Sequence, residues 1–327
     1  MQVREFEDGC VVTQVLLVRS AEIRRSRGGD EYLKLELGDR TGSVGAIVRD
    51  EVAQTRELCP PGAVVWVLGR FSRHQRFGPQ LEVETIRAPA ADEYDEAVLA
   101  DGPVRSAAQM EADLRELLAT IQNPCLRRLL ALVFGEDSPT WAHFREAPAA
   151  KRYHQAYRHG LLEHSLTVAQ AVSTISATFP GIDREVAVTG ALLHDLGKLG
   201  TYEMHGDAIE MSDHGRLFGE IPLGYYHVRR LIEDIDGFPP ETAEAVLHII
   251  LSHHGTLEHG SPVIPCTREA TLVHMIDNLG GRLGSFDRLE VGLPSGEQWS
   301  AYDKGIGGGA YFAARPERGR DRARRAA

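Results

Sequence analysis

The sequence is poor in cysteine, and the cysteines it has form no pattern. Cys10, Cys59, Cys125 and Cys266 are scattered along the chain, and no two of them have CxxC spacing. This spacing excludes a zinc knuckle and a disulfide framework, and it indicates reduced cytoplasmic thiols or small core residues.

Two further absences concern membranes and export. No apolar run among the 327 residues reaches the length that spans a bilayer. The opening residues Met1-Gln2-Val3-Arg4-Glu5 lack the basic-then-apolar order of a secretory signal, so we expect a cytoplasmic protein.

An excess of positive charge is also missing. The formal net charge of -11 argues against a surface that binds nucleic acid all over, although a local basic groove remains compatible with it. With 43% hydrophobic and 25% charged residues, the composition is that of a globular protein, and 327 residues are enough for two domains with full cores.

The first ninety residues carry a series of short strands. Residues 31–37 alternate apolar and charged side chains with the period of two expected of a half-buried strand, and residues 39–42 form a turn after it. We predict strands at residues 11–18, 31–37, 43–48, 62–69 and 80–84. Five short strands in this length favour a small all-β OB-fold barrel, which we place at residues 1–88.

Two basic clusters in this region are candidates for gripping a single-stranded nucleic acid. They span residues 24–27 and 70–77, and the second interleaves arginines with phenylalanines. Such interleaving is typical of a groove that stacks bases and follows phosphates. The competing interpretation is a solvated hairpin with two core phenylalanines. The candidate contact residues are Tyr32, Arg73, Arg76 and Phe77.

The pattern changes at residues 89–105, which we interpret as an acidic linker that ends in Gly102-Pro103. From Ser106, a plausible N-cap, Leu114, Leu117, Leu118 and Ile121 recur at helical spacing. We expect an all-α domain over residues 106–312. Residues 313–327 are rich in arginine and are predicted to form a disordered basic tail.

The helical part contains an adjacent histidine and aspartate, His194-Asp195, within the apolar stretch 192–198. On an apolar helix, each unpartnered polar side chain costs roughly 1–3 kcal/mol. A divalent cation would satisfy both, because imidazole and carboxylate together ligate Mn, Fe, Zn or Mg. Alone the pair is a weak signal, since a helix-capping aspartate beside a core histidine has the same sequence.

Further histidines and acids flank this pair, namely His164, Glu220, His253, His254 and Asp277. The pattern H…HD…E…HH…D resembles the metal-binding set of the HD-domain phosphohydrolase superfamily, which is all-helical with ligands that project inward. The resemblance implies a first metal on His164, His194, Asp195 and Asp277. It implies a second on Glu220, His253 and His254, with Asp195 as the bridge. The alternative is a set of unrelated core polar residues.

Over residues 5–312 the chain also resembles the YhaM-type 3′-5′ exoribonucleases of bacteria, which join an OB-fold to an HD domain. The motifs that carry this resemblance lie at residues 29–42, 148–157, 160–164, 251–265 and 299–303. Two departures stand out. This chain has His154-Gln155 where the family usually has paired histidines, and Gly219-Glu220-Ile221 where it usually has Gly-His-Ile.

This resemblance implies metal-dependent hydrolysis of single-stranded RNA from the 3′ end to 5′-mononucleotides, with single-stranded DNA as an alternative substrate. Two divalent ions are implied, with Mn²⁺ first and Mg²⁺, Fe²⁺ or Co²⁺ as alternatives. Asp195 and Lys198 are the candidate catalytic residues, with Lys198 on the scissile phosphate or, in the competing interpretation, at a helix surface. Arg158 and Arg216 are candidate phosphate clamps. His227 is the rival of Glu220 as a ligand.

Three other functions fit parts of the sequence. An HD enzyme for a small nucleotide (a nucleotidase, a dNTP hydrolase or a cyclic-dinucleotide phosphodiesterase) would have the same helical cluster, and only the barrel disfavours it. A binding module with an inactive HD site would have lost ligands, which this chain retains apart from the change at residue 220. A di-iron oxygenase would use the same ligand set with Fe and O₂.

Overall fold

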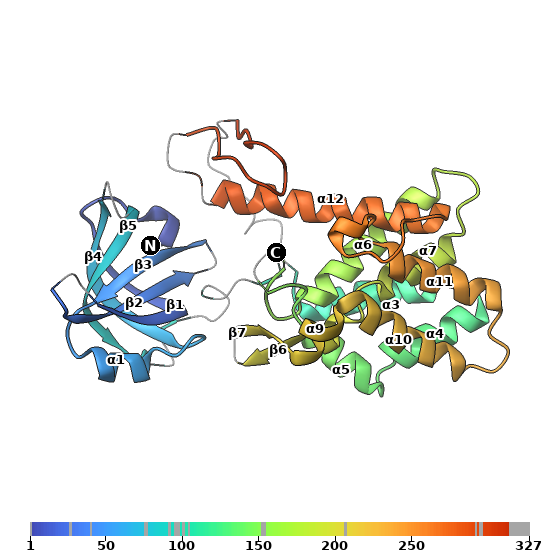
Figure 1. Cartoon of the computed structure of the whole chain (residues 1–327), viewed down its shortest axis with the longest axis horizontal. Coiled ribbons are helices and arrows are strands. Elements are labelled where there is room, and N and C mark those ends of the chain that lie inside the picture. Colours follow the sequence, from blue (N-terminus) through green and yellow to red (C-terminus); the bar gives the residue numbers. More distant parts are fainter. Residues whose placement is uncertain are drawn as a thin grey trace.

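The computed structural model describes residues 2–25, 28–39, 41–74, 78–90, 93–94, 99, 102–103, 105–151, 155–205, 208–291, 293 and 297–313. Within these ranges a β-barrel and a helical part lie at opposite ends of the molecule (Figure 1). Each part has a hydrophobic core of its own, so the chain folds around two centres. No helix in the described part of the chain has the length and apolar character needed to cross a membrane.

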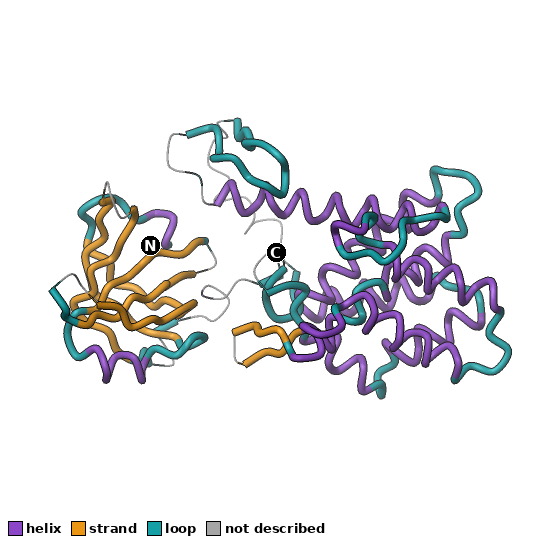
Figure 2. Tube along the Cα trace, in the orientation of Figure 1, coloured by secondary structure: helices purple, strands orange, loops and turns teal. Residues whose placement is uncertain are grey.

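The barrel is built from all five predicted strands (Figure 2). They are β1 (Val11–Arg25), β2 (Glu31–Asp39), β3 (Gly42–Val48), β4 (Val64–His74) and β5 (Gly78–Arg87). The barrel closes in the order β1-β2-β3-β5-β4, with β3 and β5 parallel and the other pairs antiparallel. Leu33, Leu35 and Leu37 are fully buried while Lys34 and Glu36 between them are exposed. The predicted OB-fold barrel is confirmed.

Two local features of the barrel were not predicted. A short helix, α1 (Val52–Leu58), connects β3 to β4, and Thr55 is its buried residue. Strand β4 shifts register at Gly69, where a Cβ atom would lie 2.3 Å from the Glu82 carbonyl oxygen. Only glycine allows so close an approach between β4 and β5.

The helical part begins at the predicted N-cap, Ser106. Its longer helices are α3 (Ala107–Ala119), α4 (Pro124–Phe134), α5 (Pro139–Glu146), α6 (Gly160–Ser176), α7 (Arg184–Leu193), α10 (Glu220–Glu233), α11 (Pro240–Ser252) and α12 (Arg268–Val291). Ser106 caps α3 by accepting a hydrogen bond from the Gln109 amide, and Leu114 and Ile121 are buried, as expected. Much of the predicted acidic linker and all of the tail after residue 313 lie outside the described residues.

The helical part also contains a feature that an all-α prediction leaves out. After the short helix α8 (Lys198–Thr201), strands β6 (Tyr202–His205) and β7 (Ala208–Met211) form an antiparallel hairpin, which leads into α9 (Asp213–Phe218). The all-α prediction is incomplete here, because two strands of four residues are too short to show a period in the sequence.

Candidate metal centre

Seven side chains from the helical part come together in two groups. The possible ligand atoms of each group lie within 4.8 Å of one another. The first group is His164, His194 and Asp277, and the second is Asp195, Glu220, His253 and His254. All seven predicted metal-site residues are therefore brought to one place. Their role as ligands is part of the proposal below.

These side chains come from the ends and inner faces of several helices. His164 lies on α6, Asp277 on α12, and Glu220 is the first residue of α10. His253 and His254 follow the end of α11. A set drawn from four helices and one turn can face a common centre only after the helices have packed.

The His194-Asp195 pair lies in a turn, and the expectation that it sits within a helix is wrong. Helix α7 ends at Leu193 with His194 as its C-cap, and the chain turns before α8 begins at Lys198. The turn packs directly on α10, because a Cβ atom at Gly197 would lie 1.9 Å from the Glu220 carbonyl oxygen. Glycine at this position lets the pair approach Glu220 closely.

Asp195 faces both groups with different oxygens. Its Oδ2 lies 3.1 Å from His164 Nε2 and 3.4 Å from His194 Nε2. Its Oδ1 lies 3.6 Å from His253 Nε2. A buried carboxylate with one oxygen toward each group has the geometry of a bridge between two cations.

All four histidines of the cluster direct Nε2 toward its centre. Their Nδ1 atoms face oxygen acceptors outside it: Ala191 O at 2.7 Å for His194, Ile250 O at 2.8 Å for His253, His259 O at 2.9 Å for His254 and Gln155 Oε1 at 3.0 Å for His164. An oxygen that only accepts requires a proton on Nδ1, so Nε2 is the nitrogen that each ring can offer to a cation. Histidines that ligate metals are held in this way.

The charges in the cluster favour ionised acids. Burial raises the pKa of Asp195, but the Lys198 ammonium and the nearby histidines outweigh burial and hold it well below its usual range. Burial also raises the pKa of Asp277, yet the hydrogen bond from His164 lowers it overall. For His164, burial lowers the pKa, while Asp195 and Asp277 raise it to about 10. Burial dominates at His194 and lowers its pKa to about 4.

Two polar atoms of the second group are buried without a hydrogen-bond partner in the described structure, Asp195 Oδ1 and His253 Nε2. Leaving a buried polar atom without a hydrogen bond costs roughly 1–3 kcal/mol, and for Asp195 Oδ1 the Lys198 ammonium 3.4 Å away offsets part of that cost. They lie 3.6 Å apart, and each can offer a lone pair. A divalent cation would accept these lone pairs and would be attracted by the ionised carboxylates beside them. The residues present therefore fit such an ion.

Lys198 is closely paired with the acids of the second group. Its Nζ donates to Glu220 Oε2 at 2.8 Å and lies 3.4 Å from Asp195 Oδ1. Burial lowers its pKa, but these two carboxylates raise it overall, so the ammonium stays charged. Lys198 is buried, and the competing interpretation of a surface lysine at a helix end is wrong.

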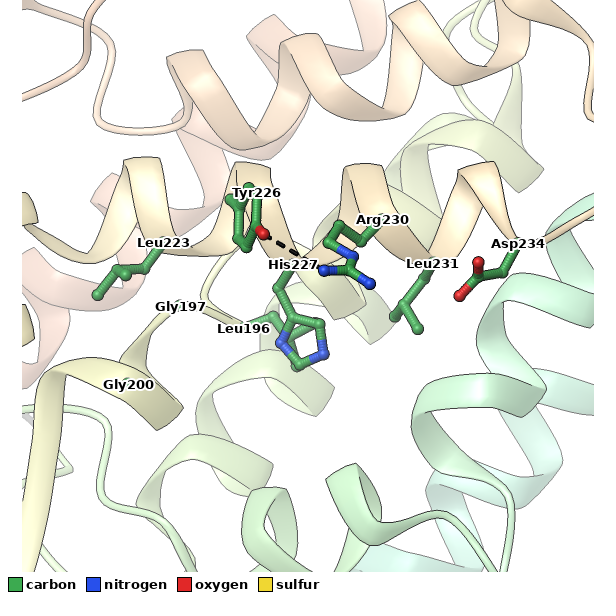
Figure 3. Close-up of a pocket in the computed structure, with 9 residues that line it drawn as sticks. All are labelled: Leu196, Gly197, Gly200, Leu223, Tyr226, His227, Arg230, Leu231 and Asp234. Atoms are coloured by element: carbon green, nitrogen blue, oxygen red, sulfur yellow. Dashed lines mark hydrogen bonds between the residues drawn. The ribbon is translucent and has the colours of Figure 1, made fainter.

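Glu220 lies in the cluster and His227 does not. Glu220 Oε1 is 3.3 Å from His254 Nε2, and Gly219 before it adopts a φ of 76° that a side chain would strain. Among the described residues, His227 belongs to neither group of possible ligands. Its ring instead lines a separate cavity of about 430 Å³ between α10 and the turn at Leu196 (Figure 3).

The two candidate phosphate clamps are exposed arginines. Arg158 lies just before α6, where its Nε donates to Glu146 Oε2, and 65% of its side chain is exposed. Arg216 lies on α9 and is also exposed. Neither is brought into the cluster itself.

In the barrel, two of the four candidate nucleic-acid contacts lie within the described residues, and one of these two is exposed. Arg73 is exposed, with its guanidinium carbon 5.9 Å from the Phe71 ring. Phe71 itself is buried against Phe6, so it belongs to the core, as the competing interpretation held. Tyr32 is half-buried on β2. Arg76 and Phe77 lie outside the described residues.

The first basic cluster is partly neutralised by neighbouring acids. Tyr32 lies opposite Arg24 on β1, and Arg24 pairs with Glu22 at 2.7 Å. Arg25 pairs with Glu31 at 2.9 Å. These exposed pairs offset part of the positive charge that the sequence cluster suggested.

One residue that sequence reasoning treated only as a departure from the family contacts a histidine of the cluster. Gln155 contacts His164 through its side chain, and it is buried. The departure from the family pattern could have indicated this contact. A glutamine that replaces a histidine close to the motif at residues 160–164 is expected to hydrogen-bond a neighbouring side chain.

Comparison with known proteins agrees with this geometry. Residues 161–281 match the family model described as HD domain. The 3′-5′ exoribonuclease YhaM of a Geobacillus species is 29% identical over 297 residues, which is 89% of each chain. YhaM of Bacillus subtilis is 28% identical over 295 residues, 89% of this chain and 91% of its own. YhaM of Halalkalibacterium halodurans is 28% identical over 297 residues, 89% of this chain and 90% of its own.

Among solved structures, the second OB-fold domain of replication protein A from Methanococcus maripaludis matches 27% of this chain and 92% of its own. Its sequence identity is 20% and the TM-score is 0.23. The resemblance to the YhaM-type 3′-5′ exoribonucleases that the motifs predicted is confirmed over most of the chain.

Proposed function

We propose that this protein is a metal-dependent 3′-5′ exoribonuclease, which hydrolyses single-stranded RNA to 5′-mononucleotides. The observation that carries the proposal is the pair of ligand groups joined by Asp195, with four histidines that present Nε2 to the same centre. The resemblance to YhaM-type proteins over 89% of the chain supports RNA as the substrate and the 3′ end as the starting point. Single-stranded DNA is a second substrate to test.

We assign His164, His194 and Asp277, with Asp195 Oδ2, to one ion. Glu220, His253 and His254, with Asp195 Oδ1, would hold a second. Divalent ions supply an activated water and neutralise the phosphate oxygens in this kind of hydrolysis. Mn²⁺ is our choice of metal because the acids contribute oxygen donors beside the imidazoles.

The chain's own residues keep this centre charged and oriented. Lys198 stays protonated between Asp195 and Glu220, and we propose that its ammonium meets the scissile phosphate there. Arg158 and Arg216 would hold phosphates farther along the strand, since guanidinium groups suit bidentate phosphate contacts. The barrel would grip the RNA behind the 3′ end, with Tyr32, Arg73, Arg76 and Phe77 as the proposed contacts.

The first test is direct hydrolysis. The full chain with Mn²⁺ should shorten 5′-labelled single-stranded RNA one nucleotide at a time and release 5′-mononucleotides. EDTA should stop the reaction, because all the proposed chemistry requires the ions. Gel analysis of the shortened RNA and chromatography of the products measure both effects.

The same experiment separates the competing functions. An RNA with a blocked 3′ end is the matched control and should persist. Fragments cut internally, or a rate that EDTA leaves unchanged, would contradict the proposal. Preferred turnover of a nucleotide panel would indicate the small-nucleotide hydrolase, and O₂ consumption with Fe²⁺ would indicate the oxygenase.

A second prediction concerns Glu220. Because a carboxylate is a harder ligand than imidazole, wild type should work best with Mn²⁺ and should tolerate Mg²⁺ better than Glu220→His does. Glu220→Ala should lose one bound metal per chain, whereas His227→Ala should keep the wild-type count, since His227 lies in the separate cavity. Metal analysis by mass spectrometry decides this. Loss of a metal from His227→Ala, with none from Glu220→Ala, would show that the assignment is wrong.

A further inference from the structure

Gln155 occupies a buried and conformationally unusual position next to the metal centre. It lies in the loop before α6 and is 6% exposed. Its φ of 60° places it in the left-handed region, which is unfavourable for a residue other than glycine. A residue in this conformation is held there by its surroundings.

Both ends of the Gln155 amide have a partner. Oε1 accepts a hydrogen bond from His164 Nδ1 at 3.0 Å, and Nε2 donates to Glu163 Oε2 at 3.2 Å. The Tyr157 hydroxyl donates to the same Glu163 oxygen. Because a carboxylate only accepts, the amide nitrogen must face Glu163 and the amide oxygen must face His164.

The backbone around Gln155 leaves the side chain little freedom. Its carbonyl oxygen accepts from the Ala149 amide at 3.1 Å. The same oxygen would lie 2.1 Å from a Cβ atom at Gly160, the first residue of α6. The loop is therefore locked against the start of the helix that carries His164.

His164 differs from the other histidines of the centre in how it is held. His194, His253 and His254 direct Nδ1 to backbone carbonyl oxygens, which no substitution removes. The partner of His164 is a side chain, so the orientation of this histidine depends on the identity of residue 155.

We propose that Gln155 is a positioning residue of the metal centre. It fixes the proton of His164 on Nδ1, and so directs the Nε2 lone pair to the ion shared with His194 and Asp277. This inference rests on the metal centre assigned under the proposed function. An amide and a neutral imidazole each combine one acceptor with one donor. A histidine at position 155 could therefore bond His164 and Glu163 as glutamine does.

The test compares metal affinity in three variants of the full chain. Gln155→Met keeps an unbranched side chain of similar length and removes both hydrogen bonds, so Mn²⁺ affinity by calorimetry should fall by about 10- to 100-fold. Gln155→His should restore most of the affinity, because it can form both bonds. Gln170→Met, the same substitution at a glutamine on α6 itself, is the control and should bind like wild type.

A spectroscopic measurement separates positioning from general destabilisation. With ¹⁵N-labelled histidine and Zn²⁺ bound, wild type and Gln155→His should show a His164 Nδ1 proton protected from exchange. Gln155→Met should lose that protection. If Gln155→Met fails to fold, the comparison of wild type with Gln155→His still decides: an unprotected Nδ1 proton in wild type overturns the inference.

Unchanged Mn²⁺ affinity in a folded Gln155→Met protein would likewise overturn it. If only the proposed function is wrong, the measurements give a different result. Wild type would then bind Mn²⁺ in a manner that depends on Gln155 but would leave RNA intact. Wild type that binds no divalent ion would contradict both proposals.

Discussion

Asp195→Ala should abolish RNA hydrolysis, with a fall in rate of more than about 1,000-fold, while RNA binding stays close to that of wild type. The reason is the position of Asp195 between the two groups. Its Oδ2 faces His164 and His194, and its Oδ1 faces His253. Removing the side chain takes a donor from both proposed ions at once, and it leaves the buried Lys198 ammonium with Glu220 alone.

Single-turnover rates with saturating RNA and Mn²⁺ measure the effect, and fluorescence anisotropy measures binding. His194→Ala should give a similar loss, since its Nε2 belongs to the first group. Asp213→Ala is the matched control, because this aspartate lies on α9 and is exposed. Wild-type turnover by a well-folded Asp195→Ala protein would refute the assignment of the centre.

Removing the barrel should weaken the grip on long RNA by about 100-fold, which corresponds to about 2.7 kcal/mol of binding free energy. A truncated protein that begins at Pro103 keeps the whole hydrophobic core of the helical part, because the two cores share no residue. It should still cleave a small aryl phosphodiester. Affinity for RNA of ten or more nucleotides should fall, since stacking on aromatic side chains contributes roughly 1–3 kcal/mol per base.

The salt dependence of binding gives an independent measure of the same loss. Fewer phosphates would be neutralised without the barrel, so the plot of log affinity against log salt concentration should be shallower. The circular dichroism spectrum of the truncated protein and its rate on the aryl substrate are the controls. Equal affinity and an equal salt slope in the two proteins would mean that the barrel does not bind the RNA.

The architecture followed from local patterns. The alternation at residues 31–37 predicted β2 because successive strand side chains point to opposite faces, and Ser106 marked the start of α3 because its hydroxyl caps a free amide. Helix α1 and the β6–β7 hairpin were missed. Segments of seven and four residues are too short for a period to be read, and such short elements depend on packing for their stability.

For the centre, residue types and spacing together with the family resemblance predicted all seven members of the cluster. They could not reveal that His194 and Asp195 lie in a turn, that Lys198 is buried between two acids, or that His227 lines another cavity. Each of these depends on which side of a helix meets which neighbour. That outcome is settled by the packing of the whole core.

The sequence, with the family resemblance, thus determined an OB-fold barrel, a helical HD part and the identity of the seven residues that meet in one His/Asp/Glu cluster. The tertiary structure alone decided which oxygen of Asp195 faces which group, and that His164 is held by Gln155. The physical reason is the separation along the chain of the residues that interact. Strand periods and caps arise from neighbours within a few residues, whereas the geometry of the cluster arises where α6, α10, α11 and α12 converge from distant parts of the chain.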